Sequence, residues 1–70
     1  MKAFVLIEAI LNLLQATEEI ETLSNEAKKD FVYRIEEMRK QLFWLGYFDN
    51  KKYSQLLDER ELLLIHSIVW

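Results

Sequence analysis

The 70-residue sequence predicts an all-α fold: a three-helix bundle, or a helical hairpin with an extra N-terminal helix. Apolar residues recur at spacings of three and four over three segments, as they do along one face of an α-helix. The chain also has one glycine and no proline, so few residues interrupt these segments. We expect a single domain over residues 1–70, with helices at about 3–21, 25–45 and 50–68.

The first predicted helix, residues 3–21, is apolar on more than one side. One row has spacings of three, four and three residues: Phe4, Ile7, Leu11 and Leu14. A second row runs beside it: Leu6, Ile10 and Leu13. So wide an apolar surface predicts a helix that lies between the other two or against a second subunit. Lys2 and the apolar run after it resemble a signal peptide, but Glu8 and Asn12 interrupt the run, which favours an amphipathic helix.

The second predicted helix, residues 25–45, begins at a capping signal. Ser24 is a suitable N-cap and Glu26 lies in the first turn, where a negative charge favours the helix dipole. One continuous helix over residues 3–45 stays an alternative, because nothing here is an obligate breaker. The core side is a row at spacings of four and three: Phe31, Ile35, Met38, Leu42 and Leu45. We expect i, i+4 ion pairs between Asp30 and Arg34 and between Glu36 and Lys40.

A tight turn is predicted between the second and third helices. Gly46 suits the left-handed position that ends a helix, and Asp49 or Asn50 suits the N-cap of the next. In the third helix we expect Tyr53, Leu56 and Leu57 to face inward. Seven of the last nine residues, 62–70, are apolar, which predicts either a buried helix end or a partner surface, with a β-strand as a minor alternative.

Aromatic residues near the turn are the best candidates for a protein-binding site, because Trp, Tyr and Phe are enriched at the centres of interfaces. The candidates are Tyr33, Phe43, Trp44, Tyr47 and Phe48. Tyr33 and Trp44 lie opposite the core row of their helix, so they point outward if that row is buried. The alternative is that the end of the hairpin folds over them.

Self-association is predicted from size and composition. Hydrophobic residues make up 51% of the chain, and a body this small has too little interior to bury them all. We therefore expect a homo-oligomer, most simply a dimer. The candidate interface residues are Phe4, Ile7, Leu11, Leu14, Leu63 and Trp70.

Catalytic and metal chemistry are disfavoured. The chain has no cysteine and one histidine, His66, whose neighbour Ser67 points about 100° away on a helix. We predict a non-enzymatic protein without catalytic residues, cofactor or metal, and we interpret His66 as structural. The acidic groups are read as solvated helix faces or as an acidic docking surface: Glu18, Glu19 and Glu21; Glu36 and Glu37; Asp58, Glu59 and Glu61.

The charge of the chain restricts its partners. A net charge of −3 and a pI near 5.0 disfavour nucleic acid and anionic membranes, which attract clustered basic residues. No run of 18 apolar residues occurs, so no spanning helix is expected. The absence of cysteine fits a reducing cytosol, and we predict a cytoplasmic protein.

Two short resemblances point to helical hairpins that act on other proteins. Residues 34–63 resemble the short C-terminal hairpin called SHOCT, through Ile35, Met38, Leu42, the run 46–49, Tyr53 and the pair 62–63. That resemblance implies oligomerisation. Residues 54–58 are similar to the Ser-Gln-Glu-Leu-Asp signature of small sporulation aspartyl-phosphate phosphatases, with Leu56 in place of Glu. That resemblance implies a functional role for Asp58.

The sequence is therefore most consistent with a small protein-binding module: an adaptor, inhibitor or regulator, of a size typical of phage or mobile-element genes. It would act through its helical hairpin and through self-association, with acidic groups steering a basic partner. Two alternatives stay open, a purely structural homo-oligomer and an aspartyl-phosphate phosphatase of a response regulator.

Overall fold

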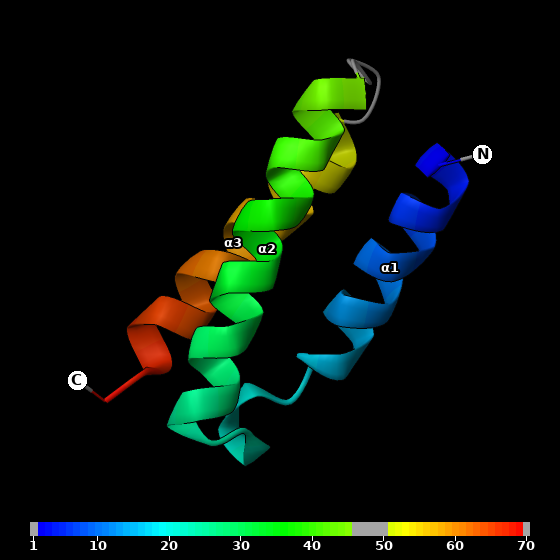
Figure 1. Ribbon diagram of the computed structural model, residues 1–70. Coiled ribbons are helices and arrows are strands. Elements are labelled where there is room, and N and C mark those ends of the chain that lie inside the picture. Colours follow the sequence, from blue (N-terminus) through cyan, green and yellow to red (C-terminus); the bar gives the residue numbers. More distant parts are fainter. Residues whose placement is uncertain (1, 46–50, 70) are drawn as a thin grey trace.

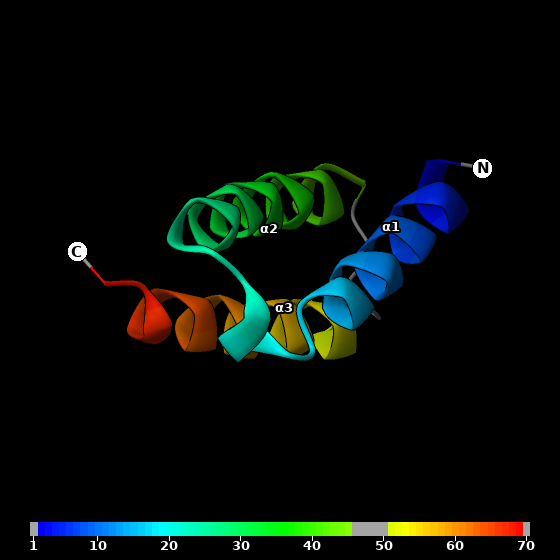
Figure 2. The same cartoon turned by 90° about the horizontal axis from the view of Figure 1, so that it is seen from below.

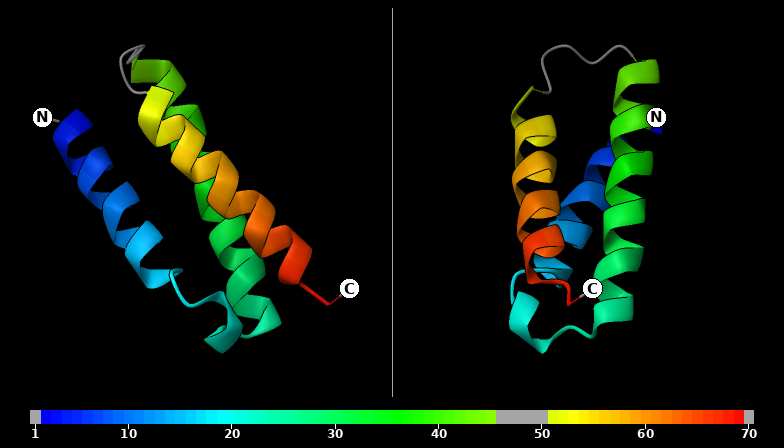
Figure 3. Two further views of the ribbon diagram at one scale, coloured as in Figure 1. Left: turned by 180° about the vertical axis from the view of Figure 1, so that it is seen from behind. Right: turned by 90° about the vertical axis from the view of Figure 1, so that its left-hand side faces the viewer.

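Three α-helices form the fold, which confirms the predicted all-α class. The computed structural model describes residues 2–45 and 51–69. The elements are α1 (Lys2–Ala16), the 3₁₀ helix η1 (Ile20–Thr22), α2 (Asn25–Leu45) and α3 (Lys51–Ser67), and these described residues include no strand. α2 and α3 run antiparallel side by side, and α1 lies against both (Figures 1 and 3). Figure 2 shows the three helices around a common centre.

The first helix is shorter than predicted, because α1 ends at Ala16 and not near residue 21. The Thr17 hydroxyl donates to Leu13 O at 2.8 Å, and a threonine bonded to the preceding turn in this way tends to bend a helix. The chain then forms η1, where the Leu23 N–H donates to Ile20 O at 3.0 Å. The alternative of one continuous helix over residues 3–45 is therefore wrong.

The start of α2 follows its capping signal. Ser24 Oγ accepts a hydrogen bond from the Ala27 N–H at 3.1 Å, and Glu26 lies in the first turn. This satisfies one of the backbone donors that the first turn of a helix leaves free. The predicted turn residues Gly46, Asp49 and Asn50 lie outside the described residues, and α3 begins at Lys51.

The core is formed by one apolar row from each helix. Its buried members are Leu6, Ile10, Leu13, Ile35, Leu42, Leu57 and Leu64. On α1 the buried row is the second of the two that the sequence shows. On α2, Ile35 and Leu42 of the predicted row are buried, with Phe31 and Met38 partly buried beside them. Leu57 of α3 is buried as predicted, and Tyr53 and Leu56 are half-buried.

Polar side chains join the helix ends. Arg60 of α3 donates to Leu14 O at 2.8 Å and to Thr17 Oγ1 at 2.9 Å, at the C-terminal end of α1. The buried Lys28 of α2 donates to Ser67 O at 3.0 Å, at the C-terminal end of α3. Cations at these positions satisfy free carbonyls and oppose the negative end of the helix dipole. They fix α1 to α3, and the start of α2 to the end of α3.

The surface ion pairs of α2 agree with the prediction in one case of two. Arg34 Nε lies 2.9 Å from Asp30 Oδ2, as expected. Lys40 Nζ instead lies 3.3 Å from Glu37 Oε2, an i, i+3 pair, and not beside Glu36. Both spacings place side chains next to each other on a helix, so the sequence alone does not choose between them.

Candidate functional site

The exposed aromatic residues of α2 form the candidate site, and we name Tyr33, Phe43 and Trp44 the α2 aromatic face. Trp44 is 82% exposed and Phe43 is 79% exposed, and Tyr33 is also exposed. α2 turns its Ile35 and Leu42 side inward, so a residue such as Trp44, nine positions after Ile35, points away from the core. The described hairpin residues therefore do not fold over these rings.

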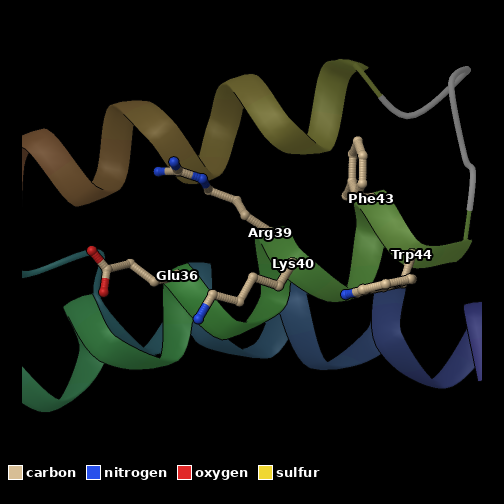
Figure 4. A pocket seen from close by; sticks show the side chains of 5 residues that line it. All are labelled: Glu36, Arg39, Lys40, Phe43 and Trp44. Atoms are coloured by element: carbon tan, nitrogen blue, oxygen red, sulfur yellow. The ribbon is translucent and has the colours of Figure 1, made fainter.

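A shallow open depression of about 730 Å³ lies at the Phe43 and Trp44 end of this face. It is lined by Glu36, Arg39, Lys40, Phe43 and Trp44 (Figure 4). Arg39 and Phe43 extend toward α3, whereas Lys40 and Trp44 project away from it. The Phe43 and Trp44 rings meet edge to face, with centroids 6.4 Å apart and planes at 78°. This arrangement is a favourable one for an aromatic pair.

A smaller hollow of about 320 Å³ lies between α2 and the C-terminal part of α3, and we name the two adjoining hollows the groove. Its lining residues are Lys29, Val32, Tyr33, Glu36, Ile65 and Ile68. Glu36 lines both hollows, so they adjoin along one side of α2. The groove therefore offers apolar surface at both ends and a carboxylate between them.

Charged groups at the site are held by neighbouring side chains. Arg39 forms ion pairs with Asp58, at 3.0 Å, and with Glu61, both on α3. Lys40 pairs with Glu37. These contacts fix the lining of the depression and leave the aromatic rings as its principal apolar surface.

Glu61 is the one buried carboxylate of the region, which corrects the expectation that its acidic group is solvated. Burial raises the pKa of the Glu61 carboxyl above its ordinary value of 4.5, and Arg39 opposes this rise. The Glu36 carboxylate, a hydrogen bond with Glu36, and Asp58 raise the pKa further. The free-energy cost of burying the charged Glu61 carboxylate therefore depends on its pairing with Arg39.

The helical positions of Glu61 and Arg39 in the sequence indicate their pairing. Glu61 lies four residues after Leu57 and three before Leu64, so it stands within the buried row of α3. Arg39 lies four residues after Ile35, next to the buried row of α2. An acid within the buried row of one helix and a base beside the buried row of its neighbour predict a pair between them.

The structure does not describe the two remaining binding candidates. It does give the exposure of most of the predicted oligomer-interface residues. Tyr47 and Phe48 lie outside the described residues, as does the interface candidate Trp70. Phe4, Leu11 and Leu63 are exposed. Ile7 and Leu14 are half-buried. The structure therefore brings together Phe43 and Trp44, with Tyr33 further along the same helix.

Residues with possible chemistry lie apart from one another. Asp58 is exposed and paired with Arg39, and His66 is exposed in the last turn of α3. Within residues 2–45 and 51–69, no group of three or more histidine or acidic side chains could hold a metal ion. The helices in the described part of the chain are all too short or too polar to span a membrane.

Comparison of the chain with protein-family models, with curated proteins and with solved structures finds no match.

Proposed function

We propose that this chain is a small non-enzymatic binding protein, an adaptor, inhibitor or regulator that captures a protein partner on the α2 aromatic face. The observation that carries the proposal is the exposure of Phe43 and Trp44 side by side at an open depression. Aromatic residues at a hollow are typical of the centre of a protein–protein interface.

The energetics of the two rings support this function. Fully burying a large apolar side chain such as Phe is worth about 1.5–3 kcal/mol. Two such rings can offset a substantial part of the cost of association, which is of order 4–15 kcal/mol. Mutual contact between Phe43 and Trp44 also restricts their motion before a partner arrives.

The net charge of the chain, −3, favours a partner that presents basic groups around an apolar anchor. Beside the rings, Glu36 is exposed, and the two cations Arg39 and Lys40 are paired with acidic side chains. Complementary charges at the rim of an interface raise the association rate more than the affinity. Salt should therefore slow association with such a partner, while the aromatic contacts set how long the complex lasts.

The test is recovery of partners by the tagged protein from lysate of its own source, compared with a Trp44→Ala variant. We expect specific proteins to be retained by wild type and by Val5→Ala, and to be lost with Trp44→Ala. Val5 is the matched control, because it is also a highly exposed apolar residue but lies on α1, away from the α2 aromatic face. Equal retention by Trp44→Ala, with an unchanged circular dichroism spectrum, would contradict the proposal.

A further inference from the structure

The apolar row on α1 that the core does not use is a second candidate surface. We name Phe4, Ile7, Leu11 and Leu14 the α1 stripe. Phe4 is 72% exposed and Leu11 is 49% exposed, whereas Ile7 and Leu14 are half-buried at the edge of the core. We propose that a second copy of this chain covers the α1 stripe and forms a two-fold symmetric dimer. This inference does not depend on the proposed function.

The chain as a whole, of which the α1 stripe is one part, exposes more surface than a monomer of its mass. The chain exposes 5368 Å², whereas a monomeric protein of 8.5 kDa exposes about 4,650 Å². The difference is about 700 Å², close to the roughly 800 Å² that each partner buries in a standard interface. The radius of gyration of 12.1 Å also exceeds the roughly 11 Å expected for 70 residues. A second chain would account for this excess surface.

The composition of α1 favours a copy of itself over a charged partner. Lys2 and Glu8 are the charged residues within Lys2–Ala16, and neither belongs to the stripe. The four stripe residues are uncharged, so an apolar surface such as the same stripe on a second copy is their suitable partner. Glu8 lies four residues after Phe4 and three before Leu11, so it borders the stripe and would stand at the rim of the interface.

The spacing of the stripe makes it self-complementary. Steps of three, four and three residues read the same in both directions along the helix. In a two-fold dimer the same patch serves both subunits, so its residues must pack against themselves. Spacing of this kind is what allows side chains of one helix to fit between those of another.

Leu63 of α3 is a further candidate for the proposed interface. Leu63 is exposed and lies three residues after Arg60, whose guanidinium reaches the end of α1. Residues three apart on a helix share a side, so Leu63 lies on the side of α3 that is turned toward α1. The proposed interface therefore includes residues of two helices.

The test is the mass of the protein in solution, measured by sedimentation over about a hundredfold range of concentration. We expect wild type to approach twice 8.5 kDa at high concentration and to dissociate on dilution. Leu11→Lys should weaken association roughly a hundredfold, since each subunit loses a buried leucine and gains a charge. The new lysine lies three residues after Glu8 and can form an ion pair with it, so the substitution should preserve α1.

Val5→Lys is the matched control, because Val5 is exposed on α1 but lies on another side of the helix from the stripe. It should dimerise like wild type. Phe4→Lys is a second variant in case Leu11→Lys loses helix content, and should also be monomeric. A wild type that stays monomeric at every concentration would overturn the proposal. This holds even if it bound neutral phosphatidylcholine vesicles, because a lipid surface and not a second copy would then cover the stripe. The proposal would also be overturned if Val5→Lys lost the dimer as fully as Leu11→Lys does. The same holds if Trp44→Lys lost the dimer and Leu11→Lys kept it.

Discussion

Arg60 and Thr17 join α3 to the end of α1. Arg60 Nη1 donates to Thr17 Oγ1 at 2.9 Å, while the Thr17 hydroxyl donates to Leu13 O at 2.8 Å. Thr17 is fully buried, so its hydroxyl depends on these partners. One side chain of α3 thus satisfies both a buried hydroxyl and the Leu14 carbonyl at the end of the first helix.

Replacing Arg60 with alanine should therefore destabilise the fold. Hydrogen bonds to charged groups contribute about 1.5–3 kcal/mol, and the variant removes the charged donor that Thr17 Oγ1 and Leu14 O share. We expect the free energy of unfolding to fall by about that amount in urea denaturation. Lys40→Ala is the control, since its ion pair with Glu37 is largely exposed and is worth about 0.5 kcal/mol or less. Similar losses for both variants would contradict the role of Arg60.

Leu42 and Phe43 are neighbours in sequence with opposite environments, which provides a second prediction. Leu42 is 4% exposed and belongs to the core, whereas Phe43 is 79% exposed. Leu42→Ala should cost about 2–5 kcal/mol, and Phe43→Ala should change stability by less than about 0.5 kcal/mol. Thermal and chemical unfolding of the two variants would measure this contrast. A large loss with Phe43→Ala would mean that its ring is buried within the monomer.

Lys28 should contribute more to stability than an exposed lysine. Its stem is buried and its ammonium donates to Ser67 O at the end of α3. Lys28→Met keeps the stem but removes the donor, and we expect a loss of about 1.5–3 kcal/mol. Lys52→Met, at an exposed position in the first turn of α3, is the control. Hydrogen exchange should show faster opening near Ser67 in Lys28→Met alone.

Glu61 should make stability depend on pH. Its folded pKa is raised by burial, so the folded state binds more protons than the unfolded state above pH 4.5. The associated stability is present below pH 4.5 and is lost as the pH rises through the folded pKa of Glu61. The groups that act on it are Arg39 and Glu36 from α2 and Asp58 from α3.

Glu61→Gln removes this titration, and we expect its stability relative to wild type to rise from pH 4.5 toward neutral. Urea denaturation at a series of pH values would measure the difference. Glu59→Gln is the control, because Glu59 is exposed, and its stability relative to wild type should stay nearly constant. A difference for Glu61→Gln that falls with pH would show that Arg39 outweighs burial.

Periodicity predicted the parts of the fold that local sequence controls. The apolar rows at Ile35 and Leu42 and at Leu57 indicated the buried sides of α2 and α3, and Ser24 marked the start of α2. The outward orientation of Trp44 follows from the same helical geometry. These features depend on neighbours within a few residues along the chain, which a single sequence displays directly.

The sequence alone predicted the helical class, the cap of α2 and the outward orientation of Tyr33 and Trp44 if the Ile35–Leu42 row is buried, because 3.6-residue periodicity and capping are local. The tertiary structure decided which of the two apolar rows of α1 is buried, where α1 ends, and that Glu61 is enclosed beside Arg39. The buried row of α1 and the enclosure of Glu61 depend on residues more than 20 positions away, and the end of α1 is held both by the local Thr17 bond and by the distant Arg60. Such contacts exist only once the helices pack, so helical periodicity does not reveal them.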